Sequence, residues 1–370
     1  MHLSRLQCAT RLFLGLGILS ASLLPARSEA MRCALDGDLV PRGLVVVLPE
    51  RTYDSMNLEA MKNPYMSGVK AHINWRDIEP VQGKPDWSKL DALFAAAEAA
   101  RKWVYLGISP GFFSPVWALA GAESDQFEMQ YGPGRGTLEQ LPMPWDRVYL
   151  GHWFEFMRLV SARYGGLPAF RMIAAAGPTS VSSETTLPNQ PSARQRLLAH
   201  GYTYAKYVSA WEEAFRFYAM AFPNQCISLA GLNVQILAPR TKDAAAGLRV
   251  KQEFVERARQ AIGSRLAIQW NDLHAGHAAV EAPDNIQFIN SYNGRVITGF
   301  EMRSQSQNLD ASRVMGAEGD PPLALRRSIE KGMAPNPSGR HVDYLEIYVA
   351  DVVPAAMQPV LSYAASLFQH

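Results

Sequence analysis

This 370-residue sequence has almost no excess of basic over acidic residues and few cysteines, and each of these features excludes a class of function. Lys and Arg number 36 against 34 Asp and Glu, so the formal net charge is only +2. Nucleic-acid binding needs a basic surplus or a basic patch, and we therefore expect no nucleic-acid partner. The three cysteines follow no metal-ligand spacing, so we expect neither a metal nor another cofactor.

Long apolar runs are also missing, apart from Leu12–Leu24 near the start of the chain. That run is shorter than the roughly 20 apolar residues that a membrane span needs. Arg5 and Arg11 precede it and the small-residue exit Ser28-Glu29-Ala30 follows, which is typical of a secretory signal peptide. We predict a signal peptide in residues 1–30, a mature chain of residues 31–370 that is secreted or periplasmic, and no stable membrane insertion. A retained anchor is the alternative.

Cleavage of the signal peptide would lower both the net charge and the number of cysteines. It would remove three arginines and one glutamate, a net charge of +2, and leave the mature chain formally neutral. Only Cys33 and Cys226 would remain. In an oxidising compartment they could form one disulfide, and the alternative is two buried thiols.

Short β-branched or aromatic runs alternate with helical patterns along the chain. The helical spacing is clear at Leu90, Leu93, Phe94 and Ala97, which share one face. Eight strand–helix units predict an α/β fold, a single-domain (β/α)8 TIM barrel. An open doubly wound sheet is the alternative, but it requires a glycine fingerprint that Gly43–Glu50 lacks. The predicted strands are Gly43–Leu48, Ser67–Ile73, Lys102–Ile108, Phe170–Ala176, Cys226–Leu232, Arg265–Gln269, Val296–Met302 and Asp343–Ile347.

Acids, aromatic rings and amides gather where these strands end. In such a barrel the loops at the carboxyl ends of the strands carry the function. Amides and acids can hydrogen-bond sugar hydroxyls, while indoles and phenols stack on the apolar ring faces. The pattern therefore predicts a carbohydrate site. Its candidate residues are Asn74, Trp75, Arg76, Trp117, Glu184, Asn271, Asp272, His274, Glu301, Glu346 and Tyr348.

One segment resembles a known family. The pattern W-R-x-I-E-P at Trp75–Pro80, Gly83, D-W-S-K-L-D at Asp86–Asp91 and Pro115-Val116-Trp117 resemble the amino-terminal half of retaining clan A glycoside hydrolases. They are most similar to the β-galactosidase-type proteins of glycoside hydrolase family 42. The resemblance covers about Gly43–Trp117, and the remainder follows only in strand order. It implies hydrolysis or transfer at O-glycosidic bonds by two carboxylates about 5 Å apart.

The resemblance also implies where the two carboxylates lie. The acid/base is expected at the end of the fourth strand, where the sequence offers Glu184, although Ser183 stands where clan members usually have Asn. The nucleophile is expected at the end of the seventh strand, where Glu301 lies. By period-two alternation Glu301 shares a side with Gly299, which would lie one layer beneath it. Glu346 on the last strand also faces the barrel interior and stays open as the nucleophile.

The other candidates have both functional and structural interpretations. We predict that Trp75, Trp117, Asn271, His274 and Tyr348 line the sugar site, but either tryptophan could be a packing residue. Arg76 is predicted to bind there or to orient a carboxylate, and an ion pair of Glu301 with Arg76 or Arg303 is the structural alternative. His274 and His277 lack a third metal ligand.

The sequence thus predicts an exported glycosidase that acts on an oligosaccharide or polysaccharide. The alternative from another class is a catalytically inactive barrel that binds glycans. A third hypothesis, a hydrolase using His274 and Asp272, would need a nucleophile or metal for which the sequence offers no candidate.

Overall fold

The computed structural model describes residues 33–35, 37, 39–48, 55–130, 134–181, 184–232, 244–276, 285–306 and 319–369. Met31–His370 form one compact unit. The predicted signal peptide, His277 and a short helix expected near Ala278 lie outside the described residues. Across the described ranges, no helix combines the length and the apolar character that a bilayer crossing demands.

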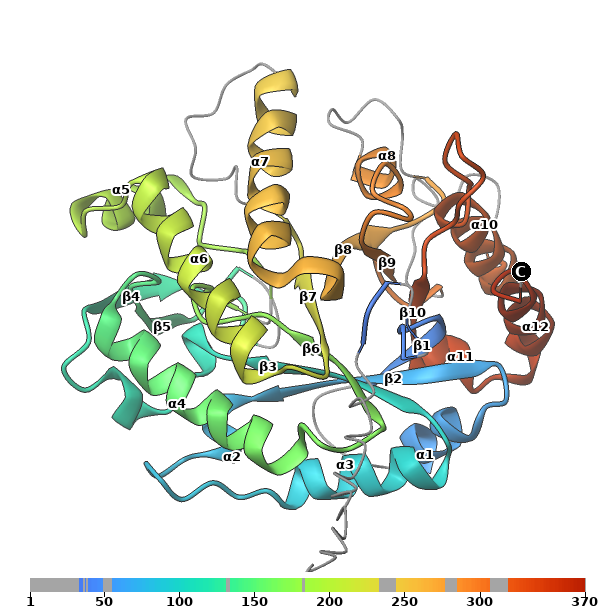
Figure 1. The fold of residues 1–370 in the computed structure, drawn as a ribbon, viewed down its shortest axis with the longest axis horizontal. Coiled ribbons are helices and arrows are strands. Elements are labelled where there is room, and N and C mark those ends of the chain that lie inside the picture. The colour runs from blue at the N-terminus through green and yellow to red at the C-terminus, as the bar shows by residue number, and fades with distance from the viewer. Residues whose placement is uncertain are drawn as a thin grey trace, which may run out of the picture. The chain divides into compact units, whose positions relative to one another are not determined.

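Eight parallel strands close into a barrel in the order β1-β10-β9-β8-β7-β6-β3-β2 (Figure 1). The single-domain (β/α)8 prediction is confirmed, and all eight predicted strands are present with ends shifted by a few residues. Their bounds are β1 Gly43–Leu48, β2 Met66–Asn74, β3 Trp103–Ser109, β6 Phe170–Ala174, β7 Cys226–Ala230, β8 Leu266–Leu273, β9 Ile297–Met302 and β10 Tyr344–Tyr348.

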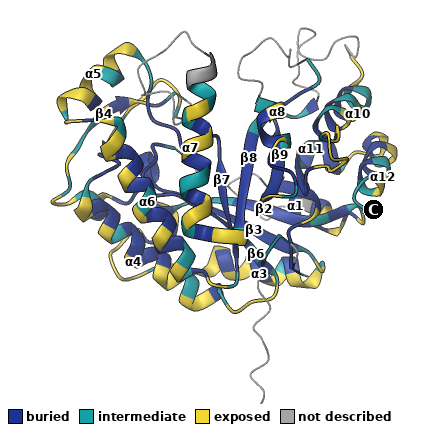
Figure 2. Cartoon of the chain, turned by 45° about the horizontal axis from the view of Figure 1, so that its top comes forward, coloured by how far each residue is buried: buried dark blue, intermediate teal, exposed yellow. Residues whose placement is uncertain are grey.

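Helices surround the barrel and turn their buried faces toward it (Figure 2). Side-chain caps fix where two long helices begin: the Asp146 carboxylate accepts from the Tyr149 backbone N–H, and the Thr203 hydroxyl accepts from that of Lys206. The helices are α1 Ser55–Lys62, α2 Trp75–Ile78, α3 Ser88–Ala99, α4 Arg147–Tyr164, α5 Pro191–Ala199, α6 Tyr204–Ala221, α7 Ala244–Ile262, α8 Asn285–Asn290, α10 Pro321–Gly332, α11 Val349–Val352 and α12 Gln358–Ser366.

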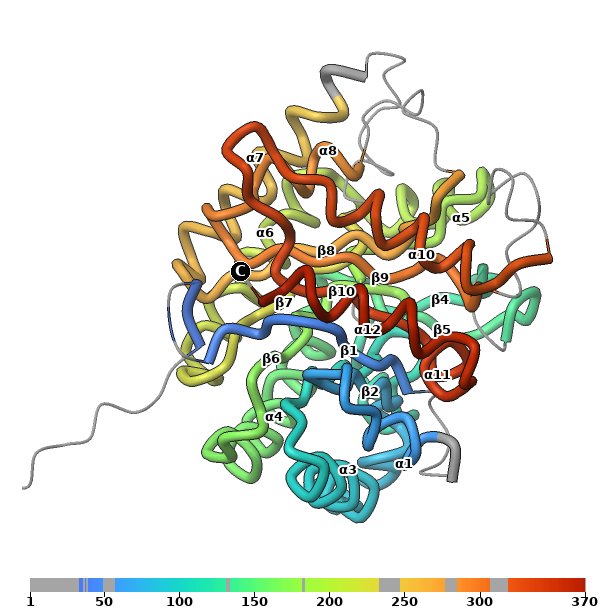
Figure 3. The backbone as a smooth tube through the Cα atoms, turned by 90° about the vertical axis from the view of Figure 1, so that its right-hand side faces the viewer, coloured from blue at the N-terminus to red at the C-terminus, as the bar shows by residue number. Residues whose placement is uncertain are grey.

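The last helix completes the closure of the barrel. Helix α12 packs against α10 and against β1, the first strand (Figure 3). The Asn63 amide donates to the Val352 carbonyl at 3.1 Å and to the Gln358 side chain at 2.9 Å, which ties the end of α1 to α11 and α12. The two ends of the chain's secondary structure therefore support each other.

The sequence did not predict a small hairpin between β3 and α4. Strands β4 Ser124–Glu128 and β5 Leu138–Pro142 pair antiparallel in this segment. They are short and mostly polar, with Phe127 and Leu141 as buried apolar residues. Such a sequence carries little of the alternation by which a strand is recognised.

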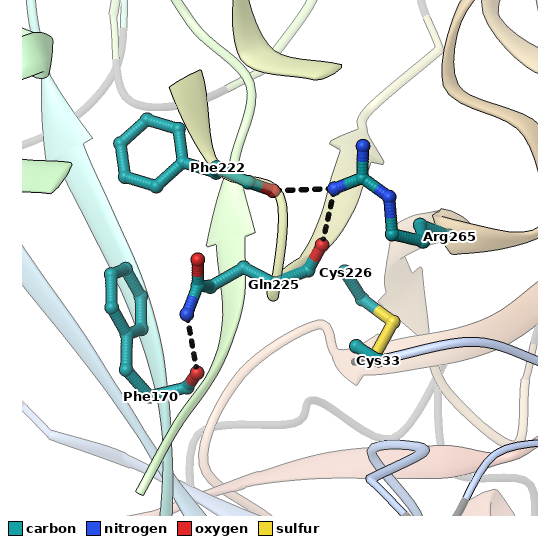
Figure 4. The surroundings of a disulfide bond; sticks show 6 residues. All are labelled: Cys33, Phe170, Phe222, Gln225, Cys226 and Arg265. Atoms are coloured by element: carbon teal, nitrogen blue, oxygen red, sulfur yellow. Dashed lines mark hydrogen bonds between the residues drawn. A yellow bond between two sulfur atoms is a disulfide. The ribbon is translucent and has the colours of Figure 1, made fainter. Parts of the chain in front are cut away.

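Ring side chains and a disulfide fill the amino-terminal part of the barrel. Two strand glycines make room for the rings: a Cβ at Gly68 would lie 2.5 Å from the Trp103 ring, and one at Gly299 would lie 2.3 Å from the Tyr344 ring. Cys33, which precedes β1, is disulfide-bonded to Cys226, the first residue of β7, with Cα atoms 5.1 Å apart (Figure 4). This settles the open choice between a disulfide and two thiols.

Candidate active site

Two acids lie side by side at the carboxyl ends of neighbouring strands. Glu346 on β10 is directly opposite Glu301 on β9 in the parallel register. Glu346 is fully buried, whereas Glu301 keeps 9% of its surface exposed. Gly299 lies two residues before Glu301 and leaves space for the Tyr344 ring, so the small residue that we predicted beneath the acid is confirmed.

A buried lysine that was not predicted from the sequence lies between these acids. Lys70 on β2 is fully buried, and its Nζ lies 2.7 Å from Glu346 Oε2 and 3.3 Å from Glu301 Oε2. Its ammonium group also lies 4.7 Å from the centre of the Tyr105 ring. A lysine in the middle of a predicted barrel strand was the available signal, because a buried cation requires an anionic partner.

Lys70, and neither arginine of the structural alternative, is the cation beside Glu301. Arg303 pairs with Asp272 at 2.7 Å, and the exposed Arg76 lies with its guanidinium 5.2 Å from the Phe113 ring centre. The predicted ion pair of Glu301 with either arginine is therefore wrong. An arginine next to a predicted strand end was the more visible candidate, but the inward-facing Lys70, four positions before the end of β2, provides the charge.

Charged and hydroxyl groups around Glu301 favour its ionised form. Burial opposes ionisation, but the Lys70 cation and a hydrogen bond from Tyr348 outweigh it and hold the pKa of Glu301 below its usual value. The Tyr348 hydroxyl donates to Glu301 Oε1 at 2.6 Å. His72, also missed, has a pKa lowered to about 4 by burial and by Lys70, so it is neutral at pH 7.

The pKa of Glu346 is shifted in the opposite direction to that of Glu301. Burial raises its pKa to about 8, and the adjacent Glu301 charge adds to this rise while Lys70 opposes it. Burial favours a neutral amine on Lys70, but Glu346 and Glu301 hold the pKa of Lys70 well above its usual value. At neutral pH the cluster therefore contains one cation and one anion, with a proton on Glu346.

Glu184 reaches the same end of the barrel from the loop that follows β6. An isolated bridge joins it to Ala230 at the end of β7. Gly231, with a φ of +74°, lets the two segments approach, since a Cβ there would lie 3.0 Å from Glu184 Cβ. Asn271 donates to Glu184 Oε1 at 2.8 Å, and Thr186 donates to Oε2 at 3.4 Å.

The surroundings of Glu184 shift it toward the protonated form. Burial raises its pKa, and the negative charge of Glu301 raises it further, while the hydrogen bond from Asn271 opposes the rise. Asn271 in turn accepts a hydrogen bond from Gln269 at 2.7 Å, which fixes its amide with the donor side toward the acid. The charge of Glu301 thus raises the pKa of Glu184, and the two acids have opposite pKa shifts.

A small pocket adjoins this region. It shares Thr186 with the Glu184 contacts, and residues after β3, after β4 and in the β6–α5 loop line it. Its lining residues are Phe112, Met129, Gln130, Ser180, Val181, Thr186 and Pro188.

Of the two tryptophans that were predicted to line the sugar site, Trp75 does not do so. Trp75 is fully buried, with ring centroids of Trp153 and Phe156 at 5.2 and 5.5 Å, and its indole N–H donates to Glu79 at 3.1 Å. It has no free face for a sugar, because α2 begins at Trp75 and directs the ring toward α4. Trp117 is half-buried, packs 5.5 Å from Trp75 and donates to the Glu79 carbonyl at 2.9 Å; its contact with sugar stays a prediction.

Some of the remaining candidate residues contact the acids, and others do not. Asn271 and Tyr348 lie in the acid cluster and hydrogen-bond Glu184 and Glu301, respectively. His274 is 6% exposed and directly follows β8, while Asp272 is held by Arg303. Among the residues that the structure describes, no group of three His, Cys, Asp or Glu side chains is arranged to hold a metal ion.

Comparison with solved structures identifies the fold. The catalytic domain of β-amylase from Paenibacillus polymyxa superposes with a TM-score of 0.57 at 11% identity, over 89% of this chain and 99% of that one. Xylanase 10B from Thermotoga maritima matches at 0.51 and 10%, over 89% and 97%. A thermostable mutant of a xylanase from Cellvibrio japonicus matches at 0.51 and 11%, over 89% and 99%. These similarities establish the shared barrel fold.

Searches by sequence add no assignment. No protein-family model matches the chain, and no curated protein sequence matches it. The resemblance to glycoside hydrolase family 42 therefore stays a prediction.

Proposed function

We propose that this protein is a glycoside hydrolase that cleaves O-glycosidic bonds with Glu184 as the acid/base and Glu301 as the nucleophile. One observation carries the proposal: the pKa of Glu184 is raised, by burial and by the charge of Glu301, and that of Glu301 is lowered. Two carboxyl groups whose surroundings separate their pKa values in this way suit the two roles of a glycosidase. The fold shared with a β-amylase and xylanases supports the same class of reaction.

Each step then follows from the two charge states. Glu184 gives its proton to the leaving oxygen while a Glu301 oxygen bonds to the anomeric carbon, which breaks the glycosidic bond. The resulting ester no longer carries the Glu301 charge, so the pKa of Glu184 falls and Glu184 becomes a base. It takes a proton from water, the hydroxide oxygen bonds to the anomeric carbon, and Glu301 leaves as a carboxylate. An alcohol acceptor in place of water would give transglycosylation.

Burial favours Glu301 over Glu346 as the nucleophile. Glu346 is fully buried and holds a proton, which removes its nucleophilic character at neutral pH. Glu301 is ionised, partly exposed and oriented by Tyr348. We assign Asn271 to holding the Glu184 carboxyl group and Tyr348 to holding that of Glu301.

The test begins with a panel of substrates. We expect turnover on at least one of aryl β-galactosides, aryl β-xylosides, xylan or starch. Glu301→Gln should abolish it for all leaving groups. Glu184→Gln should lose about 10²–10⁴-fold on poor leaving groups and less on activated aryl leaving groups, which need little protonation. Glu59→Gln on the exposed face of α1 is the control, and full activity of both site variants would refute the assignment.

The stereochemistry of the product provides a separate test. A nucleophilic Glu301 requires two displacements, so the first-formed sugar should keep the anomeric configuration of the substrate. NMR spectra recorded in the first minutes of turnover would show this. Inversion would instead make Glu301 a base that activates water.

A glycan-binding protein without catalysis is the second candidate. The observation that favours it is the 3.3 Å contact between Lys70 and Glu301, since an ion pair weakens a carboxylate as a nucleophile. This alternative predicts saturable glycan binding by calorimetry, no turnover of the bound glycan, and binding that survives Glu301→Gln.

We also propose that the protein acts outside the cytoplasm. The pattern of residues 1–30 supports export, and the Cys33–Cys226 disulfide suits an oxidising compartment. Amino-terminal sequencing of the protein recovered from the periplasm or medium should begin at Met31. Recovery of the intact leader in the cytoplasm would contradict this.

A further inference from the structure

We infer that Lys70 and Glu346 form a proton-holding pair that positions Glu301: Glu346 carries a proton and hydrogen-bonds Glu301, while Lys70 bridges the two carboxyl groups. The role assigned to Glu301 rests on the proposed function, but the protonation of Glu346 does not. Glu346 would therefore be a positioning residue for the reacting carboxylate.

Two buried acids that share one lysine favour a proton on one of them. Glu346 is directly opposite Glu301 in the strand register, and Lys70 Nζ contacts one oxygen of each acid. Two ionised carboxylates would have no hydrogen to share between them. The Lys70 ammonium group donates a hydrogen bond to Glu346 Oε2 at 2.7 Å. The other oxygen, Glu346 Oε1, is buried and has no hydrogen-bond partner among the described residues. A proton on Glu346 supplies the missing donor.

The hydroxyl groups that face the pair donate elsewhere. Tyr105 on β3 donates to Ser228 at 2.7 Å, and Tyr344 on β10 donates to Gln269 at 2.7 Å. Tyr348, also on β10, donates to Glu301 at 2.6 Å. None of these three tyrosines can therefore satisfy Glu346 Oε1 with the proton it carries.

The charged groups around Lys70 and Glu346 also favour a proton on Glu346. Lys70 is the cation, from β2, and Glu301 is the anion, from β9. His72, also on β2, is neutral near pH 7, and the pKa of Glu184, from the loop after β6, is raised by burial and by Glu301. A second anion on Glu346 would leave a fully buried site with an uncompensated charge, which is costly.

This arrangement fixes the orientation of Glu301. Lys70 holds Oε2 and Tyr348 holds Oε1, and Glu346 adds a neutral donor that brings no second negative charge. A neutral donor stabilises the carboxylate without the repulsion that an ionised Glu346 would introduce. Glutamine at position 346 would preserve both the donor and the acceptor for Lys70, whereas leucine would remove both.

Infrared spectroscopy tests the proton without any need for turnover. At pH 7 the full-length protein should show a protonated-carboxyl C=O absorption that is absent in Glu346→Gln and that disappears near pH 8 in the wild type. Glu184→Gln should remove a different component, and the exposed Glu59→Gln should remove none. An unchanged spectrum for Glu346→Gln would overturn the inference, whether or not the protein cleaves glycosides.

Kinetics test the positioning role on whichever glycoside is turned over. Glu346→Gln should keep at least tenfold more kcat than Glu346→Leu, because the amide restores the donor to Glu301. A loss in Glu346→Gln as complete as in Glu301→Gln would make Glu346 a reacting carboxylate and refute the positioning role. If no glycoside is cleaved but the infrared component belongs to Glu346, the proposed function fails and the proton pair stands.

Discussion

Replacement of Glu346 by glutamine should stabilise the protein at neutral pH. The folded protein keeps a proton on Glu346 up to about pH 8, whereas an unfolded chain releases it near pH 4.3. Between these values unfolding releases a proton, so the stability of the wild type falls as pH rises through that range. Glutamine is neutral at every pH and avoids this loss. The variant should therefore gain over the wild type as pH increases.

The size of the gain follows from the same pKa values. At pH 7 the gap from the unfolded value is about 2.7 pH units, which corresponds to an upper limit of about 3.7 kcal/mol. We expect about 1–3 kcal/mol, because the amide restores the contacts of Glu346 with Lys70 and Glu301 only in part. At pH 4.5 the difference should approach zero or reverse slightly.

Urea unfolding at several pH values between 4.5 and 7.5 measures this gain, with Glu59→Gln as the control that should show no comparable pH-dependent gain. The opposite charge state predicts the opposite sign. If Glu346 were an anion paired with Lys70, its replacement would leave a buried lysine with a weaker partner and destabilise the protein by a few kcal/mol at pH 7. A less stable Glu346→Gln at pH 7 would refute the reasoning.

Three further substitutions test other parts of the structure. Lys70→Met should cost about 3–5 kcal/mol in urea unfolding, because it leaves the buried Glu301 charge without its cation; an unaffected midpoint would mean that Glu301 is neutral. Cys33→Ser should lose about 2–5 kcal/mol of unfolding free energy, and reductant should then have no further effect on its Tm, unlike that of the wild type. Trp75→Ala should lower stability by about 3–5 kcal/mol in urea while the KM for a glycoside stays unchanged; a raised KM would restore it as a binding residue.

The barrel could be predicted because its strands carry a strong local signal. Runs such as Gly43–Leu48 are fully buried and rich in β-branched residues, so they differ plainly from the helical stretches between them. The β4–β5 hairpin could not be recognised, because its polar residues leave only a few buried apolar positions. Its strands exist through their pairing with each other, which is information that no single segment contains.

The positions of Glu301 and Glu346 could be predicted from the sequence, but their protonation states could not. Period-two alternation places Glu301 and Glu346 on the inner side of their strands, but it gives no difference in depth between them. The difference comes from Lys70, which binds both acids from another strand. Trp75 was misjudged for a related reason: the end of a strand can face the mouth or the helical layer, and the short α2 helix decides between them.

The bond between Cys33 and Cys226 makes a covalent ring of more than half the protein. The two cysteines are 193 positions apart, and the ring contains the first four barrel strands and most of the helices that cover them. A protease that cut once inside this ring would leave both fragments attached, and only reduction would separate them on a gel. Since Cys226 begins the fifth barrel strand, the bond cannot form before the four preceding strands have been synthesised.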